Sequence, residues 1–218
     1  MSTLPEKTWA IGLFLAFMII PIISSAEDIK SSDGSVAEVF IQNLGDKALS
    51  SLTGNNISDQ ERNKRLRDLL NDNFSMGTIG RFAMGKHWRS ASDKQKEEYL
   101  SLFEDLIVDT YSQRFREYSG QKFIVKGHQE ISKKDTVIHS EILPPEGSAD
   151  DAPSIKIDWR VRFKKDEYRV VDISVEGVSM IVTQRSDFDA VIQRGGGKVE
   201  ALLASLRDRN NGEEPKEL

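Results

Sequence analysis

The sequence predicts an α+β fold in which a four-stranded antiparallel sheet has several helices packed on one face. Three observations lead to this prediction. Apolar residues recur at helical spacing over residues 36–118, the period changes to 2 over residues 123–175, and helical spacing returns after Gly177. Because the strands follow one another through short connections, we expect them to form a meander.

Residues 1–26 are set aside from the fold because they are typical of a secretory signal peptide. A lysine precedes an apolar run over residues 10–23, and Ser24 and Ala26 fit a small-residue cleavage pattern. The run is shorter than the about 20 residues that span a bilayer. We therefore expect an exported, cleaved protein. A glutamate beside the lysine weakens the basic leader and leaves an uncleaved anchor as the alternative.

Composition narrows the class of protein. The 218-residue chain has no cysteine, which excludes a disulfide framework and a lipid-modified N-terminal cysteine. Its 38% hydrophobic and 30% charged residues predict one globular domain over residues 27–209, followed by a flexible polar tail over residues 210–218. A net charge of −5 argues against nucleic acid as a partner.

Capping signals place the first four helices. Ser58 and Ser92 each begin a capping-box pattern, and glycines follow three of the apolar runs. The expected helices cover residues 36–53, 58–74, 76–85 and 92–119. The apolar stripe of the last of these is wider than a surface helix needs, so we expect it to contact protein or ligand on two sides.

The four expected strands cover residues 123–125, 137–143, 155–163 and 168–175. From Ile155 to Phe163 apolar and charged residues alternate, which indicates one buried and one solvated face. Register is strongly specified when one face is buried, so an odd-numbered turn, Lys165-Asp166-Glu167, is expected. The predicted cross-strand pairs are Val161–Val171, Trp159–Ile173 and Ile157–Val175.

Two more helices follow the last strand. Beyond Gly177 the apolar spacing is helical again, with Ser179 available as the N-cap. Val178, Ile181, Val182, Phe188, Val191 and Ile192 are expected on one side of this helix. Three glycines at 195–197 end it, and a last helix is expected from Val199 to Leu206.

An enzyme has little support in the sequence. The three histidines, His87, His128 and His139, include no pair at the sequence spacing that metal ligands usually have. Asp158, Asp172 and Glu141 are possible acids or bases, but outward solvated charges explain them better. A one-sided sheet covered by helices, in an exported chain without a catalytic set, instead favours an apolar cavity. A small-molecule enzyme on a cone-shaped α+β fold, with a carboxylate base in that cavity, is the alternative.

Three segments of the chain resemble the MlaC / toluene-tolerance family of periplasmic phospholipid-binding proteins. They are Phe74 to Gln121 with "TYSQRF", Ile155 to Val161 with "IKIDWRV", and Val175 to Leu206 with "EGVSMIVTQR". The resemblance runs from about residue 36 to 208. The glycine-rich linker at 195–197 is longer than family members usually have, which affects the expected placement of the last helix.

The resemblance implies a monomeric periplasmic carrier whose sheet is twisted and whose acyl-chain cargo lies between sheet and helices. Such a carrier shuttles phospholipid between an inner-membrane ABC transporter complex and an outer-membrane lipoprotein complex, and so maintains outer-membrane lipid asymmetry. No cofactor is implied, since the bound phospholipid is cargo. Relatives beside hopanoid biosynthesis make a different lipid the alternative.

The walls of the expected cavity follow from the alternating third strand and the wide helical stripe, and the resemblance adds Tyr111, Trp159 and residues 175–181. The predicted lipid-binding residues are Met76, Ile107, Tyr111, Phe115, Ile157, Trp159, Val161, Val171, Ile173, Val175 and Met180. Arg185 is either a headgroup ligand, a snorkelling side chain or the partner of Asp189 at i+4. Lys86, Arg89 and Arg160 are candidates for partner or membrane contact.

Overall fold

The computed structural model describes residues 33–54, 56–118, 120–149 and 152–212. The expected signal peptide and the end of the expected polar tail lie outside these residues. The described helices are α1 (Gly34–Leu52), α2 (Asp59–Asn73), α3 (Met76–Met84), α4 (Asp93–Arg116), α5 (Met180–Arg194), α6 (Val199–Asn210) and the short 3-10 helix η1 (Gly85–Arg89). No helix in these described ranges is both long and apolar enough to cross a membrane.

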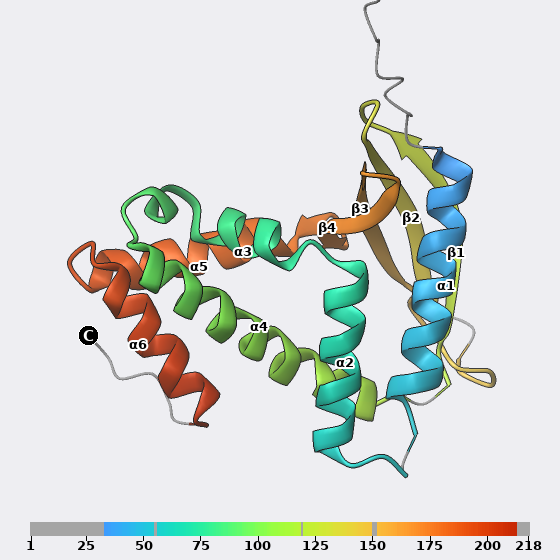
Figure 1. Cartoon of the computed structure of the whole chain (residues 1–218). Coiled ribbons are helices and arrows are strands. Elements are labelled where there is room, and N and C mark those ends of the chain that lie inside the picture. The colour runs from blue at the N-terminus through green and yellow to red at the C-terminus, as the bar shows by residue number, and fades with distance from the viewer. Residues whose placement is uncertain (1–32, 55, 119, 150–151, 213–218) are drawn as a thin grey trace, which may run out of the picture.

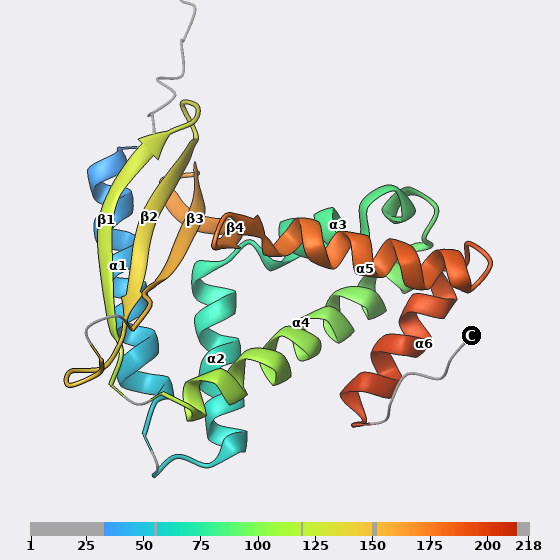
Figure 2. The same ribbon diagram turned by 180° about the vertical axis from the view of Figure 1, so that it is seen from behind.

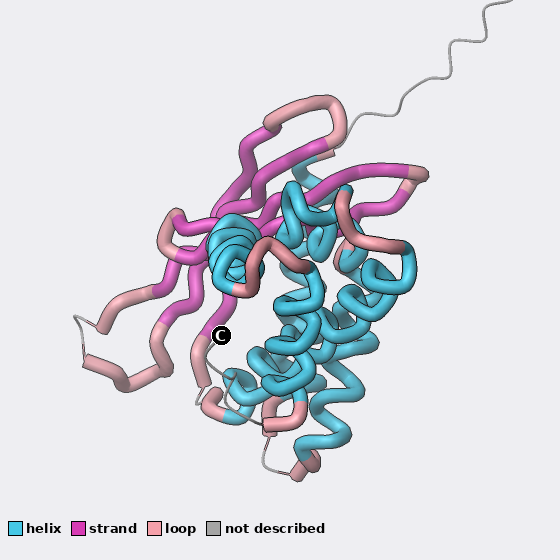
Figure 3. Tube along the Cα trace, turned by 90° about the vertical axis from the view of Figure 1, so that its left-hand side faces the viewer, coloured by secondary structure: helices cyan, strands magenta, loops and turns pink. Residues whose placement is uncertain are grey.

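The strands are β1 (Lys122–Glu130), β2 (Asp135–Leu143), β3 (Ile155–Lys164), β4 (Glu167–Val175) and the two-residue β5 (Val178–Ser179). They form one antiparallel sheet in the order β1-β2-β3-β4-β5, which confirms the predicted meander. Figure 1 shows the sheet and α1 at one end of the molecule and α3, α5 and α6 at the other, with α4 running between them. Figure 3 shows most of the helices gathered on one side of the strands, with one helix seen end-on in front of them.

Local capping signals account for most of the helix boundaries. The Ser58 and Ser179 hydroxyls accept hydrogen bonds from backbone N–H groups of the first turns of α2 and α5, and Ser92 with Gln95 forms a complete capping box on α4. In α2 the predicted box is only half present, because the Glu61 carboxylate accepts from Arg65 instead. Helix α4 ends at Arg116, three residues before the predicted end.

Helix α1 covers the face of the sheet that carries Phe123, Ile138, Trp159 and Val161, which we call the inner face. Its backbone approaches β1 closely. A Cβ added at Gly45 would lie 2.3 Å from Phe123 Cδ1, and the Gln42 side chain accepts a hydrogen bond from the backbone N–H of Val125 on β1. Figure 2 shows the opposite, outer face of β1 and β2 with no helix in front of it.

The outer face is charged, as the alternation of β3 predicts. Its one buried carboxylate among the described residues is Asp135, which accepts hydrogen bonds at 2.7–3.2 Å from the guanidinium groups of Arg162 and Arg160. Hydrogen bonds from Arg162 first, and from Arg160, hold the pKa of Asp135 below its ordinary value although burial raises it. Arg160, a candidate for partner contact, is therefore engaged within the sheet.

The β3–β4 register differs from the prediction at one pair. Ile157 pairs with Val175 and Trp159 with Ile173, as expected, but Val161 pairs with Val170 because a β-bulge at this point leaves Val171 without a partner on β3. Because the bulge adds one residue to β4, an even number of turn residues, rather than an odd number, keeps the apolar side chains of both strands on one face. The turn accordingly has two residues, Lys165 and Asp166, both with positive φ as in a type I′ turn, rather than three.

Strand β4 does not run directly into a helix. Glu176 and Gly177, with φ of 50° and 77°, make a second tight turn, and Val178 then pairs with Val175. Asp172 fixes this junction, because its carboxylate accepts hydrogen bonds from the Ser179 hydroxyl at 2.7 Å and from the backbone N–H of Ile181 at 3.3 Å. Asp172 thus organises the start of α5.

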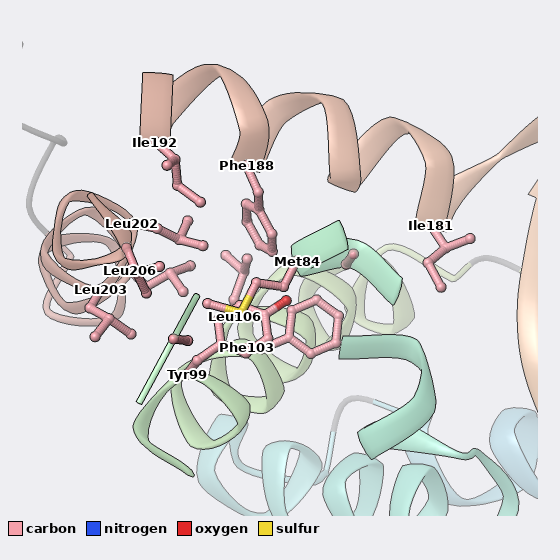
Figure 4. Close-up of a cluster of buried hydrophobic side chains, with 13 residues drawn as sticks. Met84, Tyr99, Phe103, Leu106, Ile181, Phe188, Ile192, Leu202, Leu203 and Leu206 are labelled. Atoms are coloured by element: carbon pink, nitrogen blue, oxygen red, sulfur yellow. The ribbon is translucent and has the colours of Figure 1, made fainter. Parts of the chain in front are cut away.

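Two hydrophobic cores stabilise the fold. The helical core lies where α3, α4, α5 and α6 meet, and Figure 4 shows Phe188 of α5 pointing toward Phe103 and Tyr99 of α4. The three rings lie 5.7–6.1 Å apart between centroids, and the Tyr99 hydroxyl donates to the Gly80 carbonyl oxygen. The sheet core consists of Ala37, Ile41, Leu44, Leu52, Leu66, Leu69, Leu70, Val108, Ile138, Val161 and Val170.

The apolar side predicted for α5 is only partly buried. Ile181, Phe188 and Ile192 belong to the helical core. Val178 lies in β5 and is 59% exposed, and Val182 is 54% exposed because it lies about 100° around the helix from Ile181. The prediction that these two valines share one side of the helix with Ile181 and Phe188 is therefore wrong.

An ionic contact joins η1 to α5. Asp189 Oδ1 lies 2.6 Å from His87 Nε2 and 3.0 Å from Lys86 Nζ. Hydrogen bonds from His87 and Lys86 lower the pKa of Asp189 to about 2. Asp189 therefore does not pair with Arg185, and the i+4 pairing considered from the sequence is wrong.

The close approach of α1 to the sheet predicts a difference between two glycines in helices. Gly45→Ala should lower the free energy of unfolding by about 1–2 kcal/mol, because its Cβ meets the Phe123 ring. Gly77→Ala, in α3 with no atom within 4 Å of the added Cβ, should leave stability unchanged or raise it by up to about 1 kcal/mol. Urea unfolding followed by circular dichroism measures both. Equal effects would contradict the close approach.

The depressed pKa of Asp189 predicts a pH-dependent contribution to stability. This contribution is fully present above the ordinary value of 3.8 and is lost as pH falls toward about 2. Asp189→Asn should therefore lower the melting temperature at neutral pH, and its difference from the wild type should shrink over that acidic range. Asp187→Asn, an exposed neighbour, is the control and should show little effect. A difference that stays constant with pH would exclude the ionic contact as its cause.

Candidate functional site

Helix α4 contacts both hydrophobic cores. Tyr99, Phe103 and Leu106 belong to the helical core, whereas Val108, two residues after Leu106 and so about 200° around the helix from it, belongs to the sheet core. The wide apolar stripe predicted from the sequence thus packs against one core on each of two sides of α4. Two residues, Met76 and Ile107, pack against both cores, and we call the place where they lie the seam.

The segment between α2 and α3 is held to β4 by backbone contacts. The backbone N–H of Ser75 donates to the Val170 carbonyl oxygen at 2.9 Å, and Phe74 forms a parallel bridge to Val170. Helix α3 begins at the next residue, Met76. The seam therefore lies directly beside the edge of β4.

Several of the predicted lining residues gather on the sheet side of the seam. Tyr111 and Phe115 of α4 and Trp159 and Ile173 of the sheet are partly buried and pack against the sheet core. Partly buried apolar side chains of this kind retain surface that a ligand can cover. Burial also raises the pKa of the Tyr111 hydroxyl, which keeps this residue neutral.

Trp159 is held in place by a polar contact within the inner face. Its indole N–H donates to Ser140 Oγ at 2.8 Å, and the Ser140 hydroxyl donates to the Ile157 carbonyl oxygen at 3.0 Å. The Phe123 ring packs edge-on against the indole, with the centroids 6.0 Å apart. The apolar face of Trp159 is thereby oriented without leaving a buried polar group unsatisfied.

The other predicted lining residues differ in depth. Val161 is fully buried in the sheet core, and Val171, at the bulge, is also buried. Ile157 and Val175 are opposite each other and half-buried. Met180 is 37% exposed and belongs to neither core. The structure therefore brings six of the eleven residues to the two cores as partly buried side chains: Met76, Ile107, Tyr111, Phe115, Trp159 and Ile173.

The carboxylates considered as catalytic acids or bases have structural partners. Asp158 Oδ1 lies 2.7 Å from His139 Nδ1, Glu141 lies 3.7 Å from Lys126, and Asp172 accepts from Ser179. The register places Asp158, Glu141 and Asp172 on the outer face, opposite to the face that carries Trp159 and Val161. Among the described residues, no group of three or more His, Cys, Asp or Glu side chains is arranged to hold a metal ion.

Arg185 lies apart from the predicted lining residues. Its guanidinium carbon is 5.7 Å from the centroid of the Phe82 ring, and its side chain crosses Gly85 so closely that a Cβ there would lie 2.7 Å from Arg185 Nε. It lines two open concavities at α3, η1 and α5, of about 800 and 280 Å³. The sequence pointed to Lys86, Arg89 and Arg185 separately but not to their common surface, although the basic and aromatic residues of "GRFAMGKHWR" were a signal for it.

Comparisons with known proteins agree with this architecture. The intermembrane phospholipid transport system binding protein MlaC of Haemophilus influenzae is 24% identical over 174 residues, which cover 78% of this chain and 79% of that protein. The solved structure of a phospholipid-binding protein from Ralstonia solanacearum, in complex with a phospholipid, has a TM-score of 0.68 at 20% identity and covers 81% of this chain and 97% of its own. This likeness confirms the predicted α+β fold.

A family model gives the membership directly. The model described as MlaC protein matches residues 42–208, which is most of the chain and includes every predicted lining residue. The match includes the helical core, the seam and all of the sheet core except Ala37 and Ile41. The chain belongs to the MlaC family.

Proposed function

We propose that this protein is a phospholipid carrier that encloses the acyl chains of its cargo at the seam between the helical core and the sheet core. Membership of the MlaC family supports a carrier rather than an enzyme. Both named relatives are described as phospholipid proteins, one as a transport binding protein and one in complex with a phospholipid. The observation that carries the proposal is that Met76 and Ile107 pack against two separate cores.

The energetics of the cargo require enclosure. Two acyl chains of about 15 methylenes each, at about 0.8 kcal/mol per methylene, cost roughly 24 kcal/mol to expose to water. The partly buried side chains of Tyr111, Phe115, Trp159 and Ile173 offer apolar surface next to the seam. Acyl chains that insert between the two cores at Met76 and Ile107 would pack against this surface, which would shield them from water.

We further propose that the carrier works in the periplasm after removal of residues 1–26, as a monomer. It takes or delivers phospholipid at an inner-membrane ABC transporter complex and at an outer-membrane lipoprotein complex. The name of the Haemophilus influenzae relative, which describes an intermembrane phospholipid transport system, supports this part of the proposal. Maintenance of outer-membrane lipid asymmetry follows as its role in the cell.

Mass spectrometry of an organic extract of the purified protein tests the carrier directly. We expect about one phospholipid per protein, because apolar wall surface of this kind favours occupancy by cargo. A hopanoid-type lipid in the extract would support a lipid carrier but would show that its cargo is not phospholipid. A protein that contains no lipid and turns over a small substrate would contradict the carrier and support the enzyme.

Placement of the cargo is tested by Val175→Asp. Val175 is half-buried on the inner face, two residues along β4 from Ile173, so its carboxylate replacement would lie next to the proposed acyl-chain surface. We therefore expect about ten-fold or more less co-purifying phospholipid, equivalent to at least about 1.4 kcal/mol. Val39→Asp on the exposed side of α1 is the matched control and should keep its lipid. Circular dichroism checks that both variants fold. Equal lipid contents in the two folded variants would contradict the placement.

Val161, the other position suggested by the alternation, is not a suitable test. Its side chain is fully buried in the sheet core, opposite Thr136 and Val170. A charge there would destabilise the sheet whether or not lipid binds. Loss of lipid in such a variant would report on folding alone.

A further inference from the structure

The open concavity of about 800 Å³ at α3, η1 and α5, which we call the basic depression, has an unusual lining. Four of its ten lining residues are cations and none is a carboxylate. The lining consists of Gly77, Thr78, Arg81, Phe82, Gly85, Lys86, Trp88, Arg89, Leu100 and Arg185. None of the predicted lipid-lining residues except the headgroup candidate Arg185 is among them.

The arginines of the basic depression lack ionic partners in the described part of the chain. No carboxylate oxygen in that part lies within 4.0 Å of Arg81, Arg89 or Arg185. Most other arginines, including Arg67, Arg162 and Arg207, are paired. Lys86 is the exception in the depression, because it contacts Asp189. Three unpaired guanidinium groups therefore face one concave surface and are available to an anion.

Exposed apolar side chains lie among these cations. Phe82 is 52% exposed, and the Arg185 guanidinium lies over its ring. Val182, also exposed, lines the adjoining smaller concavity together with Lys86 and Arg185. The close passage of Arg185 across Gly85, which has a φ of 59°, keeps the ring and the guanidinium together.

We infer that the basic depression is the surface through which the protein contacts an anionic phospholipid membrane. Guanidinium groups bind lipid phosphates, and an exposed aromatic ring partitions into the interface between headgroups and acyl chains. A lipid surface accepts both kinds of side chain at once. The net charge of −5 opposes the approach of the molecule as a whole to an anionic membrane, so the local cations also orient the protein. This inference rests on the proposed carrier function.

Binding should be weak and reversible. Each basic side chain near an anionic surface contributes about five-fold to the binding constant, which corresponds to about 1 kcal/mol. Three or four such side chains and one partly inserted ring give a transient contact. A carrier that must leave each membrane again needs a contact of this strength.

Co-sedimentation with lipid vesicles tests the inference. The full-length mature protein is mixed with vesicles of phosphatidylcholine alone, or of phosphatidylcholine with phosphatidylglycerol, at low and at physiological salt. We expect binding only to the vesicles that contain phosphatidylglycerol, and weaker binding at the higher salt. Arg81→Ala/Arg89→Ala should reduce the binding constant about 25-fold, since two cations are removed. Phe82→Ala should reduce it at both salt concentrations.

The control removes the same charge elsewhere. Arg194→Ala/Arg209→Ala replaces two arginines that are exposed, lack a carboxylate partner among the described residues and do not line the basic depression. This variant should bind like the wild type. Equal weakening in the two double variants would overturn the inference in favour of a general charge effect. Absence of wild-type binding to any vesicle would also overturn it, and would leave an acidic protein surface as the occupant.

Lipid content separates this inference from the proposed function. Phospholipid extracted from Arg81→Ala/Arg89→Ala should equal that of the wild type, because neither arginine lies at the seam. Normal cargo with lost vesicle binding supports the membrane contact. Lost cargo in this variant would place Arg81 and Arg89 in the cargo site and overturn the inference, while the carrier itself would stand.

Discussion

The whole arrangement depends on the rigidity of α4, a single 24-residue helix that contributes to two cores. At 1.5 Å per residue it spans about 36 Å. Its first half is fixed by Tyr99 and Phe103 in the helical core and its second half by Val108 in the sheet core. The two cores meet halfway along the helix, at Ile107. The seam exists because one helix holds together two cores that do not merge.

Local chemistry explains why so much of the fold was predictable. A serine that caps a helix acts within three residues, so Ser58, Ser92 and Ser179 mark helix starts whatever the rest of the chain does. Strand pairing is not local. The bulge that leaves Val171 unpaired, and the turn at Glu176 and Gly177, depend on how two strands meet, and one extra residue reverses the parity on which a register argument rests. Strand β1 was predicted too short for a similar reason, since its second half is polar and follows a bulge.

For the candidate site, the sequence predicted which residues share one face of the sheet but not how deeply each is buried. Alternation correctly assigned Val161, Trp159 and Ile157 to one face of β3. It could not show that Val161 is sealed in the core while Trp159 and Ile157 keep accessible surface, because depth depends on which helix packs above each position. Helical spacing similarly suggested that Asp189 pairs with Arg185. The structure brings in η1, distant in sequence, and Lys86 and His87 take the carboxylate instead.

This exchange of partners shapes the basic depression, the proposed membrane-contact surface. Because Asp189 is occupied by Lys86 and His87, the Arg185 guanidinium is left without a carboxylate and lies over Phe82. The same contact anchors η1, which carries Arg89, against α5. An apolar seam can hold acyl chains but has no means of recognising a membrane, whereas a surface of unpaired cations can recognise a membrane but cannot shield acyl chains from water. A carrier needs both properties, and placing them on different parts of the molecule lets the cargo stay enclosed while the surface binds and releases.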